Sequence, residues 1–216
     1  MLNMEDKSSP PVSNRRERKR HEMADKLACA AYALFERDGF ESVTMEQIAT
    51  AADVSRGTLY NYFPIKEALL DHYFRLEFQG GAGELLMVVT QQPSLEATLL
   101  GLFDVFADWA ADRRRYLPLS IAYGMNRRLL DGNFSSRDEL HGLFANILAA
   151  AVSRGELPVD VDVVQLADYL QHLYLAAILR WLPTDEISPR TQLHLMVRFF
   201  VSAAHSRINS DIKDMS

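Results

Sequence analysis

Apolar residues recur along this chain at intervals of three and four positions, the spacing that places them on one face of an α-helix. In the first helical segment, for example, the repeat runs through Met23, Leu27 and Leu34. No stretch alternates apolar and polar residues as a strand does, and no internal repeat is evident. The pattern therefore predicts an all-α fold of about nine helices.

Two short helices are predicted in the run TMEQIATAADVSRGTLYNYFPIK at residues 44–66. Thr44 and Gln47 have the spacing of a capping box, in which the hydroxyl accepts from the amide three residues on and the Gln side chain reaches back. The first of the two helices is therefore expected to begin at about Met45.

The first short helix is expected to end in a tight turn. Asp53 tolerates the left-handed backbone conformation, and Ser55 is a strong N-cap, so a second helix is predicted from Arg56. Pro64 disfavours helical geometry at Phe63 and ends this second helix after about two turns. The order of helix, tight turn and short polar-faced helix is the helix-turn-helix arrangement, whose second helix can lie in a DNA major groove.

The segments LFERDGF, TMEQIATAADVS, RGTLYNYF and KEALL follow one another between residues 31 and 70. This run resembles the DNA-binding domain of the tetracycline-repressor (TetR) family of bacterial transcription regulators. The family usually has Gly in place of Asp53 and a small polar cap in place of Ile65. Because Ile65 cannot cap, the next helix is expected to begin at Pro64 or around Lys66. The resemblance covers the first third of the chain, and the remainder fits in length and helical character.

The resemblance implies that the second short helix reads DNA. Arg56 is the candidate for bidentate guanine readout, Gly57 allows close backbone approach, and Asn61 can address a base edge. Other candidates carry hydroxyls or charge suited to phosphate oxygens, namely Thr44, Thr58, Tyr60, Tyr62 and Lys66. The two tyrosines have a second interpretation, which is packing within the small domain.

Net charge argues against general affinity for nucleic acid, because the 216 residues carry −6 at pH 7 and the pI is near 5.5. Any DNA affinity must come from local positive charge. The candidate is the run RRERKR at residues 15–20, which opens the first helix. It either adds salt-dependent affinity for the DNA backbone or is a solvated helix end.

Composition excludes several classes of protein. The single cysteine, Cys29, rules out a disulfide framework and is expected to be a small buried core residue in a reducing compartment. The polar N-terminus and the lack of a long apolar run predict a cytoplasmic protein with no membrane span. No catalytic or phosphate-binding motif appears, and the six histidines lack metal-ligand spacing. We therefore expect no enzyme, no cofactor and no metal.

Three segments are predicted from these patterns. Residues 1–14 form a mobile tail, residues 15–64 the helix-turn-helix domain, and residues 65–216 a larger helical bundle for ligand binding and dimerisation. The glycines at 80, 81 and 83 predict a kink or break in the fourth helix. That feature is either a hinge between domains or a plain interhelix loop.

Later helices have recognisable starts and stops. Their predicted starting signals are Pro93-Ser94, Pro118, the capping box Ser136 with Glu139, Val159-Asp160 with Val164, and Ser188-Pro189. The helix that begins with the Ser136 capping box is expected to stop at Gly155, and the last helix is expected to end at about Arg207. The last two helices are apolar over more than one face, so a partner must cover the second face. The resemblance implies a homodimer in which these helices form a four-helix bundle.

The larger bundle has enough aromatic residues to enclose a small molecule. The candidates are Phe103, Phe106, Tyr123 and His172. Most aromatic residues at helical spacing belong to the core, and His172 is equally explained as a core histidine. The resemblance implies a repressor that an unidentified small-molecule effector releases from a palindromic operator by shifting its conformational population. Two alternatives stay open: a DNA-binding regulator controlled by a protein partner or by abundance, and a helical-bundle enzyme with an accessory DNA domain.

Overall fold

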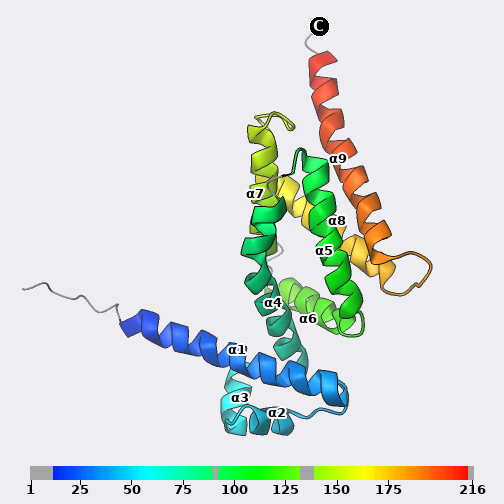
Figure 1. The fold of residues 1–216 in the computed structure, drawn as a ribbon. Coiled ribbons are helices and arrows are strands. Elements are labelled where there is room, and N and C mark those ends of the chain that lie inside the picture. The colour runs from blue at the N-terminus through cyan, green and yellow to red at the C-terminus, as the bar shows by residue number, and fades with distance from the viewer. Residues whose placement is uncertain (1–11, 90–91, 132–138, 214–216) are drawn as a thin grey trace, which may run out of the picture. The chain divides into compact units, whose positions relative to one another are not determined.

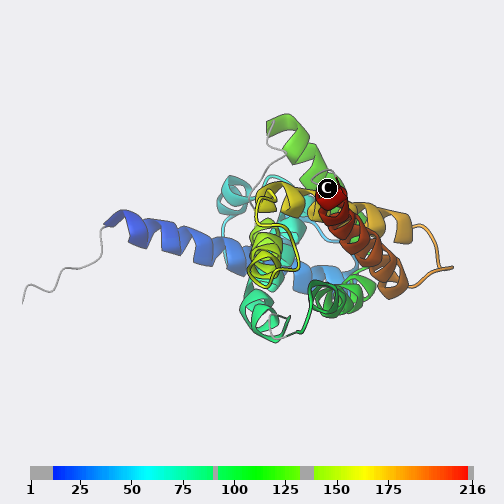
Figure 2. The same ribbon diagram turned by 90° about the horizontal axis from the view of Figure 1, so that it is seen from above.

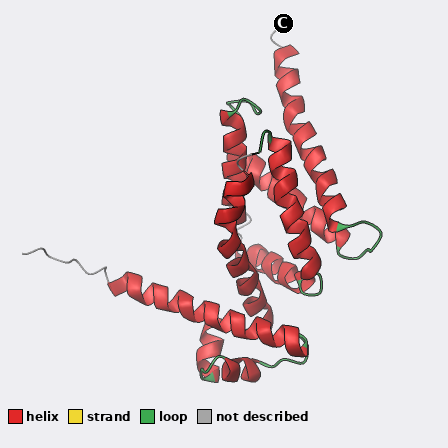
Figure 3. Cartoon of the chain, in the orientation of Figure 1, coloured by secondary structure: helices red, strands yellow, loops and turns green. Residues whose placement is uncertain are grey.

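The computed structural model describes residues 12–89, 92–131 and 139–213. Every regular element in these ranges is an α-helix, and Figure 3 shows no strand in the described part of the chain. The nine helices found there, α1 to α9, confirm the predicted all-α class (Figure 1). The fold divides into two compact units, and the boundary between Glu77 and Phe78 lies inside α4.

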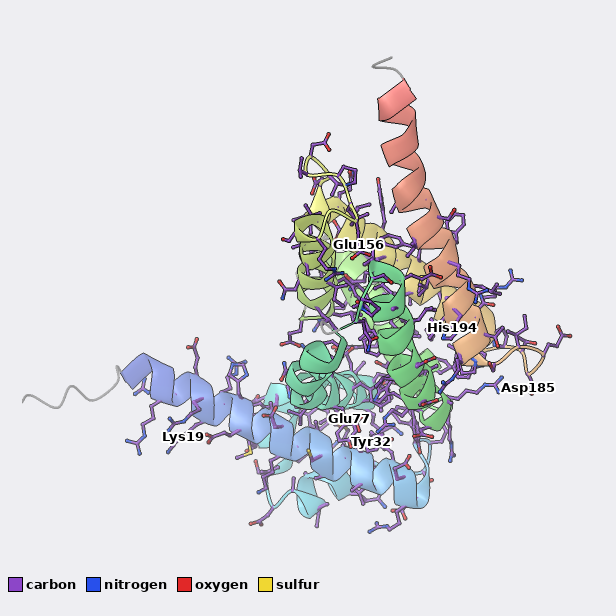
Figure 4. All side chains as sticks on the ribbon, turned by 45° about the horizontal axis from the view of Figure 1, so that its top comes forward. Lys19, Tyr32, Glu77, Glu156, Asp185 and His194 are labelled. Carbon is purple, nitrogen blue, oxygen red and sulfur yellow. The ribbon has the colours of Figure 1, made fainter. Side chains whose placement is uncertain are left out.

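The first unit contains α1 (Val12–Asp38), α2 (Met45–Ala51), α3 (Arg56–Tyr62) and the beginning of α4 (Lys66–Val89). Its core consists of side chains that are completely inaccessible to solvent, among them Leu27, Phe35, Ile48, Leu59 and Leu69. Tyr32 of α1 stacks on Tyr73 of α4 with ring centroids 3.9 Å apart (Tyr32 is labelled in Figure 4). These contacts hold α2, α3 and the beginning of α4 against α1.

The predicted ends of α2 and α3 and the start of α4 are confirmed. The Thr44 hydroxyl accepts from the Gln47 amide at 3.2 Å, and the Gln47 side chain accepts from the Thr44 amide at 2.7 Å. Asp53 has a φ of 54°, so it occupies the left-handed turn conformation. Ser55 caps α3, and Phe63 is extended at its end, before Pro64. The fourth helix begins at Lys66, the later of its two predicted starts.

Two predictions in α1 are wrong. The helix begins at Val12, so residues 12–14 are helical where a tail is predicted, because the helix-breaking prolines lie before them at positions 10 and 11. Cys29 is exposed, not buried. Leu27, Ala28 and Ala31 supply the buried face of this helix turn, and Cys29 projects from the other side.

The second unit contains the rest of α4 and five further helices. These are α5 (Leu95–Asp112), α6 (Leu117–Asp131), α7 (Glu139–Ser153), α8 (Val163–Trp181) and α9 (Pro189–Lys213). Helix α5 runs alongside α9, and α8 packs against both α7 and α9 (Figures 1 and 2). Leu99, Leu102, Phe103 and Phe144 form the centre of this bundle and are completely buried. Within the described residues, no helix has the length and apolar character needed to cross a bilayer.

Of the two interpretations of Gly80–Gly83, the plain interhelix loop is wrong, because α4 continues through these residues to Val89. Helix-interior glycines cost about 1 kcal/mol each relative to alanine. Tertiary contacts immediately before them help to offset that cost. Phe78 packs edge-on against Phe106 with centroids 6.0 Å apart, and Gln79 donates to Glu139 of α7 at 2.5 Å. A hinge within the continuous helix stays a prediction.

Two helix ends in this unit, the start of α8 and the end of α9, differ from the expected ones. Asp162, not Asp160, caps α8: its carboxylate accepts from the amides of Val164 and Gln165, both at 3.0 Å. Val159 is 90% exposed, so it makes no hydrophobic staple. Helix α9 continues past Arg207 to Lys213, since no Gly or Pro interrupts it.

Other predicted ends of the second unit are confirmed or lie outside the described residues. Ser94 caps α5, and Ser188 accepts from the Thr191 amide at 3.1 Å at the start of α9. Gly155 has a φ of 76° and ends α7 as predicted. Ser136, half of the predicted capping box for α7, lies outside the described residues.

Candidate nucleic-acid interface

Helix α3 divides into a buried and an exposed side. Leu59 is completely buried in the first unit, and Phe63 at the helix end is 7% exposed. The other side consists of polar or small side chains. Arg56, Gly57, Tyr60 and Asn61 are exposed, and Thr58 and Tyr62 are half-buried. The predicted contact residues of α3 are therefore presented together on one short helix.

Arg56 is held by two neighbours. Its Nη2 atom lies 2.8 Å from Oε1 of Glu46, which belongs to the first turn of α2. Its guanidinium carbon lies 5.5 Å from the centroid of the Tyr60 ring, one turn along α3. Both side chains of the ion pair are at least half exposed, at 64% for Arg56 and 50% for Glu46. Sequence reasoning missed Glu46, because its distance from Arg56 depends on how α2 crosses α3.

Hydroxyl groups near α3 and at the start of α2 already serve as caps. The Ser55 hydroxyl accepts from the Thr58 amide at 3.0 Å and lies 2.8 Å from the Thr58 hydroxyl. The exposed Thr44 hydroxyl accepts in its capping box. A hydroxyl that accepts in a cap still has a proton to donate to an oxygen such as that of a phosphate.

Lys66 makes its contacts with the segment that follows α1, and not with α3. Its Nζ donates to the Phe40 carbonyl at 2.6 Å and to the Glu41 carbonyl at 3.4 Å, and it lies 4.6 Å from the centroid of the Phe40 ring. The ammonium group thereby ties the start of α4 to the segment that follows α1. A phosphate contact by Lys66 stays a prediction beside this structural role.

The basic run at residues 15–20 lies in α1, and all six of its residues are exposed. Lys19 projects from this part of the helix in Figure 4. Arg18 pairs with Glu22 at 3.3 Å, an exposed i,i+4 pair that contributes little to stability. The local positive charge that DNA affinity requires in this acidic chain is thus present on an accessible helix surface.

Of the four predicted effector contacts, only Phe103 and Phe106 are brought together. Phe103 and Phe106 lie in an aromatic cluster with Tyr174, at centroid distances of 5.4 and 5.5 Å. Burial raises the pKa of the Tyr174 phenol well above its usual range. Tyr123 is a half-buried residue of α6, and His172 is an exposed residue of α8. His172 donates from Nδ1 to the Asp168 carbonyl at 2.6 Å.

His172 lines an apolar groove between α8 and α9, with a volume of about 450 Å³. Its other lining residues are mainly apolar, and they include Leu166, Tyr169, Leu173, Phe199 and Phe200. Tyr169 is 54% exposed and Phe199 is 65% exposed, although both are large aromatic side chains. The predicted second apolar face of these helices is therefore open in the single chain. Within the described residues, no group of three or more His, Cys, Asp or Glu side chains could hold a metal ion.

Comparisons with known proteins agree with this architecture. The family model for bacterial regulatory proteins of the tetR family matches residues 29–73, which include α2 and α3. The HTH-type transcriptional repressor KstR of Mycolicibacterium smegmatis is 27% identical over 205 residues, spanning 83% of this chain and 87% of KstR.

Two solved structures extend the likeness over most of the chain. The structure of Thermus thermophilus FadR, a TetR-family transcriptional repressor in complex with lauroyl-CoA, superposes with a TM-score of 0.68 at 30% identity. The match spans 82% of this chain and 93% of FadR. The ketosteroid transcriptional regulator KstR2 of Mycobacterium tuberculosis has a TM-score of 0.50 at 17% identity over 86% and 94% of the two chains, a likeness of fold. The chain therefore belongs to the TetR family and is a DNA-binding transcriptional repressor rather than an enzyme.

Proposed function

We propose that this repressor binds a palindromic operator as a homodimer and is released from it by a small-molecule effector held in the second unit. In such a complex α3 of each subunit enters a major groove, and the two α3 helices lie about 34–36 Å apart. The exposure of Arg56, Tyr60 and Asn61 opposite the buried Leu59 supports this role for α3.

The proposed contacts divide into base readout and positioning. Arg56 donates to O6 and N7 of a guanine, and Asn61 addresses a neighbouring base edge, with Gly57 allowing close approach. The phosphate contacts come from the remaining candidates, namely Thr44, Thr58, Tyr60, Tyr62 and Lys66. The exposed basic residues of α1 add affinity that depends on salt and not on sequence.

A second copy of the chain is the proposed cover for the groove between α8 and α9. Phe199 and Tyr169 expose large aromatic surfaces there, and burying them against a like surface is favourable by about 25 cal/mol per Å² of apolar area. A two-fold symmetric interface of this kind would place two copies of α3 on one operator.

A fatty acyl-CoA is the proposed effector. The support is the 30% identity and TM-score of 0.68 to Thermus thermophilus FadR, which was solved with lauroyl-CoA. The aromatic cluster of Phe103, Phe106 and Tyr174 offers an apolar environment suited to an acyl chain. The effector acts by binding more tightly to a conformer in which the two α3 helices no longer match the operator.

DNA reading is tested with a duplex that the wild-type protein selects from a random library. We expect Arg56→Ala to weaken binding to this duplex by about 5- to 150-fold, which corresponds to about 1–3 kcal/mol, and to relax the selected sequence at one guanine per half-site. Fluorescence anisotropy measures the affinity. An unchanged affinity for the selected duplex would remove Arg56 from the site.

Effector release is tested on the same protein–DNA complex. Lauroyl-CoA is expected to dissociate it, whereas lauric acid and free CoA at the same concentration are not. A ketosteroid provides an apolar comparison of different shape. Release by the ketosteroid alone would replace the proposed ligand class, and no release by any compound would favour control by a protein partner or by abundance.

A further inference from the structure

The carboxylate that pairs with Arg56 comes from α2, the helix before the turn. We propose that Glu46 is a specificity-determining residue, which positions Arg56 for guanine and turns it away from DNA phosphates. This inference rests on the proposed reading of DNA by α3. Glu46 acts through Arg56, so it is a positioning residue and not itself a base contact.

The contacts of Arg56 restrict the orientation of its guanidinium group before it meets a guanine base. The ion pair to Glu46 uses one terminal nitrogen, Nη2, at 2.8 Å. The Tyr60 ring lies 5.5 Å from the guanidinium carbon and limits the orientations of the group. A guanidinium has five N–H donors, so this pair leaves donors for the O6 and N7 atoms of guanine.

Glu46 is itself held by a rigid support. It is the second residue of α2, directly after Met45, which is 9% exposed, and two residues before Ile48, which is completely buried. Both hydrogen bonds of the capping box fix the turn that carries it. The carboxylate therefore occupies a defined place beside α3, and holding Arg56 costs little further ordering of the backbone.

Charge separates the two kinds of DNA partner. Guanine offers neutral acceptor atoms, and an arginine that shares one nitrogen with a carboxylate can still bind them. A phosphate is an anion, and it meets the negative charge of Glu46 when it approaches the same guanidinium. Glu46 therefore weakens non-specific binding, which depends on phosphates, more than it weakens binding to the operator.

Five variants test this inference in the full-length protein. Glu46→Gln removes the charge with little change of shape, and Glu46→Asp keeps the charge but shortens the side chain. Glu67→Gln is the matched control, since Glu67 is the second residue of α4 as Glu46 is of α2, and no ion pair of it occurs among the described residues. Arg56→Ala, alone and with Glu46→Gln, completes the cycle.

The measurements are affinities for two probes across a range of salt concentrations. One probe is the duplex selected by the wild-type protein, and the other is a scrambled duplex of equal length and base composition. Circular dichroism and thermal melting of each variant confirm that it is folded.

For Glu46→Gln we expect binding to the scrambled duplex to tighten about five- to tenfold at 0.1 M salt. This is the gain from one additional phosphate contact, which also steepens the salt dependence by about 0.9 in log–log slope. Binding to the selected duplex should not tighten, so the ratio of the two affinities falls at least fivefold. Glu46→Asp should keep the weak binding to the scrambled duplex, and Glu67→Gln should keep the wild-type ratio.

Different results separate this inference from the function on which it rests. If Arg56→Ala leaves the affinity for the selected duplex unchanged, the proposed reading by α3 fails. If Arg56→Ala weakens that affinity but Glu46→Gln keeps the wild-type ratio, the role of Glu46 alone is overturned. The role of Glu46 is also overturned if Glu46→Gln changes the ratio of the two affinities equally in the wild-type and Arg56→Ala proteins. Glu46 would then act on DNA directly.

Discussion

At the scale of single residues, the Glu46–Arg56 pair shows how an interaction can matter more for binding than for folding. Exposed ion pairs contribute about 0–1 kcal/mol to stability, and both of these side chains are at least half exposed. Removing the pair should therefore leave the folded state nearly unchanged. On DNA, loss of the Glu46 charge frees Arg56 for a phosphate, and one additional phosphate contact changes the affinity several-fold.

The reactivity of Cys29 is a second prediction at this scale. Partial burial, followed by the negative charges of Asp25 and Glu77, raises the pKa of the Cys29 thiol. A raised pKa lowers the thiolate fraction near neutral pH, so alkylation should follow a pH profile displaced to higher pH. Reaction with a thiol reagent, measured against pH in the native and the guanidinium-unfolded protein, checks this.

The unfolded chain is the control for that measurement, because it has the same cysteine without its neighbours. Asp25→Asn should move the native profile back toward lower pH, since it removes the carboxylate whose charge has the larger effect on the Cys29 thiol. Coinciding native and unfolded midpoints would contradict the expected effect of the surroundings.

At the scale of helices, capping groups come from the neighbouring residue and from distant segments. Ser94 caps α5 from the adjacent position, but the first amide of the helix, that of Leu95, donates to Glu156 at 2.6 Å. Glu156 follows α7 and lies close to the start of α5 (Figure 4). A carboxylate at a helix N-terminus is stabilised by the hydrogen bond and by the helix dipole.

Glu156→Ala is expected to lower the free energy of unfolding by about 1–3 kcal/mol, the usual effect of removing a charged partner from a partly buried hydrogen bond. The change also leaves Arg154 without its 2.6 Å contact to this carboxylate. Urea denaturation measures the difference. Glu36→Ala, at an exposed site on α1, is the control and should change stability by less than about 0.5 kcal/mol.

Two glycines within α4 and one just after α7 offer a matched test of backbone conformation. An added Cβ at Gly80, Gly81 or Gly155 meets no atom within 4 Å, so steric contacts do not distinguish the three sites. Gly80 and Gly81 are helical, whereas Gly155 has a φ of 76°. Alanine at either helical site should stabilise by about 0.5–1 kcal/mol, and alanine at Gly155 should destabilise by about 1 kcal/mol.

Thermal denaturation followed by circular dichroism gives the sign for each of these glycine variants. A loss of stability on Gly80→Ala or Gly81→Ala would indicate that the helix is strained or bent there in solution. Release from DNA by lauroyl-CoA, measured on the same two variants, then tests whether α4 serves as a hinge.

At the scale of the whole molecule, the apolar groove between α8 and α9 determines the expected assembly. Phe199→Glu places a charge on the most exposed of its aromatic side chains and should convert the proposed dimer into a monomer. Analytical ultracentrifugation measures the mass. Operator affinity should fall with it, because a monomer presents a single copy of α3.

Val105→Glu is the matched control, since Val105 is 49% exposed on α5 and does not line the groove. It should leave the assembly unchanged. A wild-type protein that sediments as a monomer, or a Phe199→Glu variant that stays dimeric, would contradict the proposed interface.

Local signals determined much of the first unit. The capping box at Thr44, the left-handed turn at Asp53, the cap at Ser55 and the stop at Pro64 each act within about four residues along the chain. Interactions of such short range can be predicted without knowing the fold. The same reasoning held for the α5 cap and the end of α7, and it misplaced the α8 cap by two residues, because Asp160 and Asp162 both satisfy the local rule.

The tertiary structure decided which distant residues meet. It placed Glu46 beside Arg56, directed Cys29 to the exposed side of α1, and separated His172 from the Phe103 cluster. It also kept α4 helical through its glycines, against their local preference. The sequence alone thus determined the caps of α2, α3 and α5 and the extent of α3, because these follow from hydrogen bonds between near neighbours. The neighbours of each side chain depend on how whole helices cross, and that geometry results from packing the complete core.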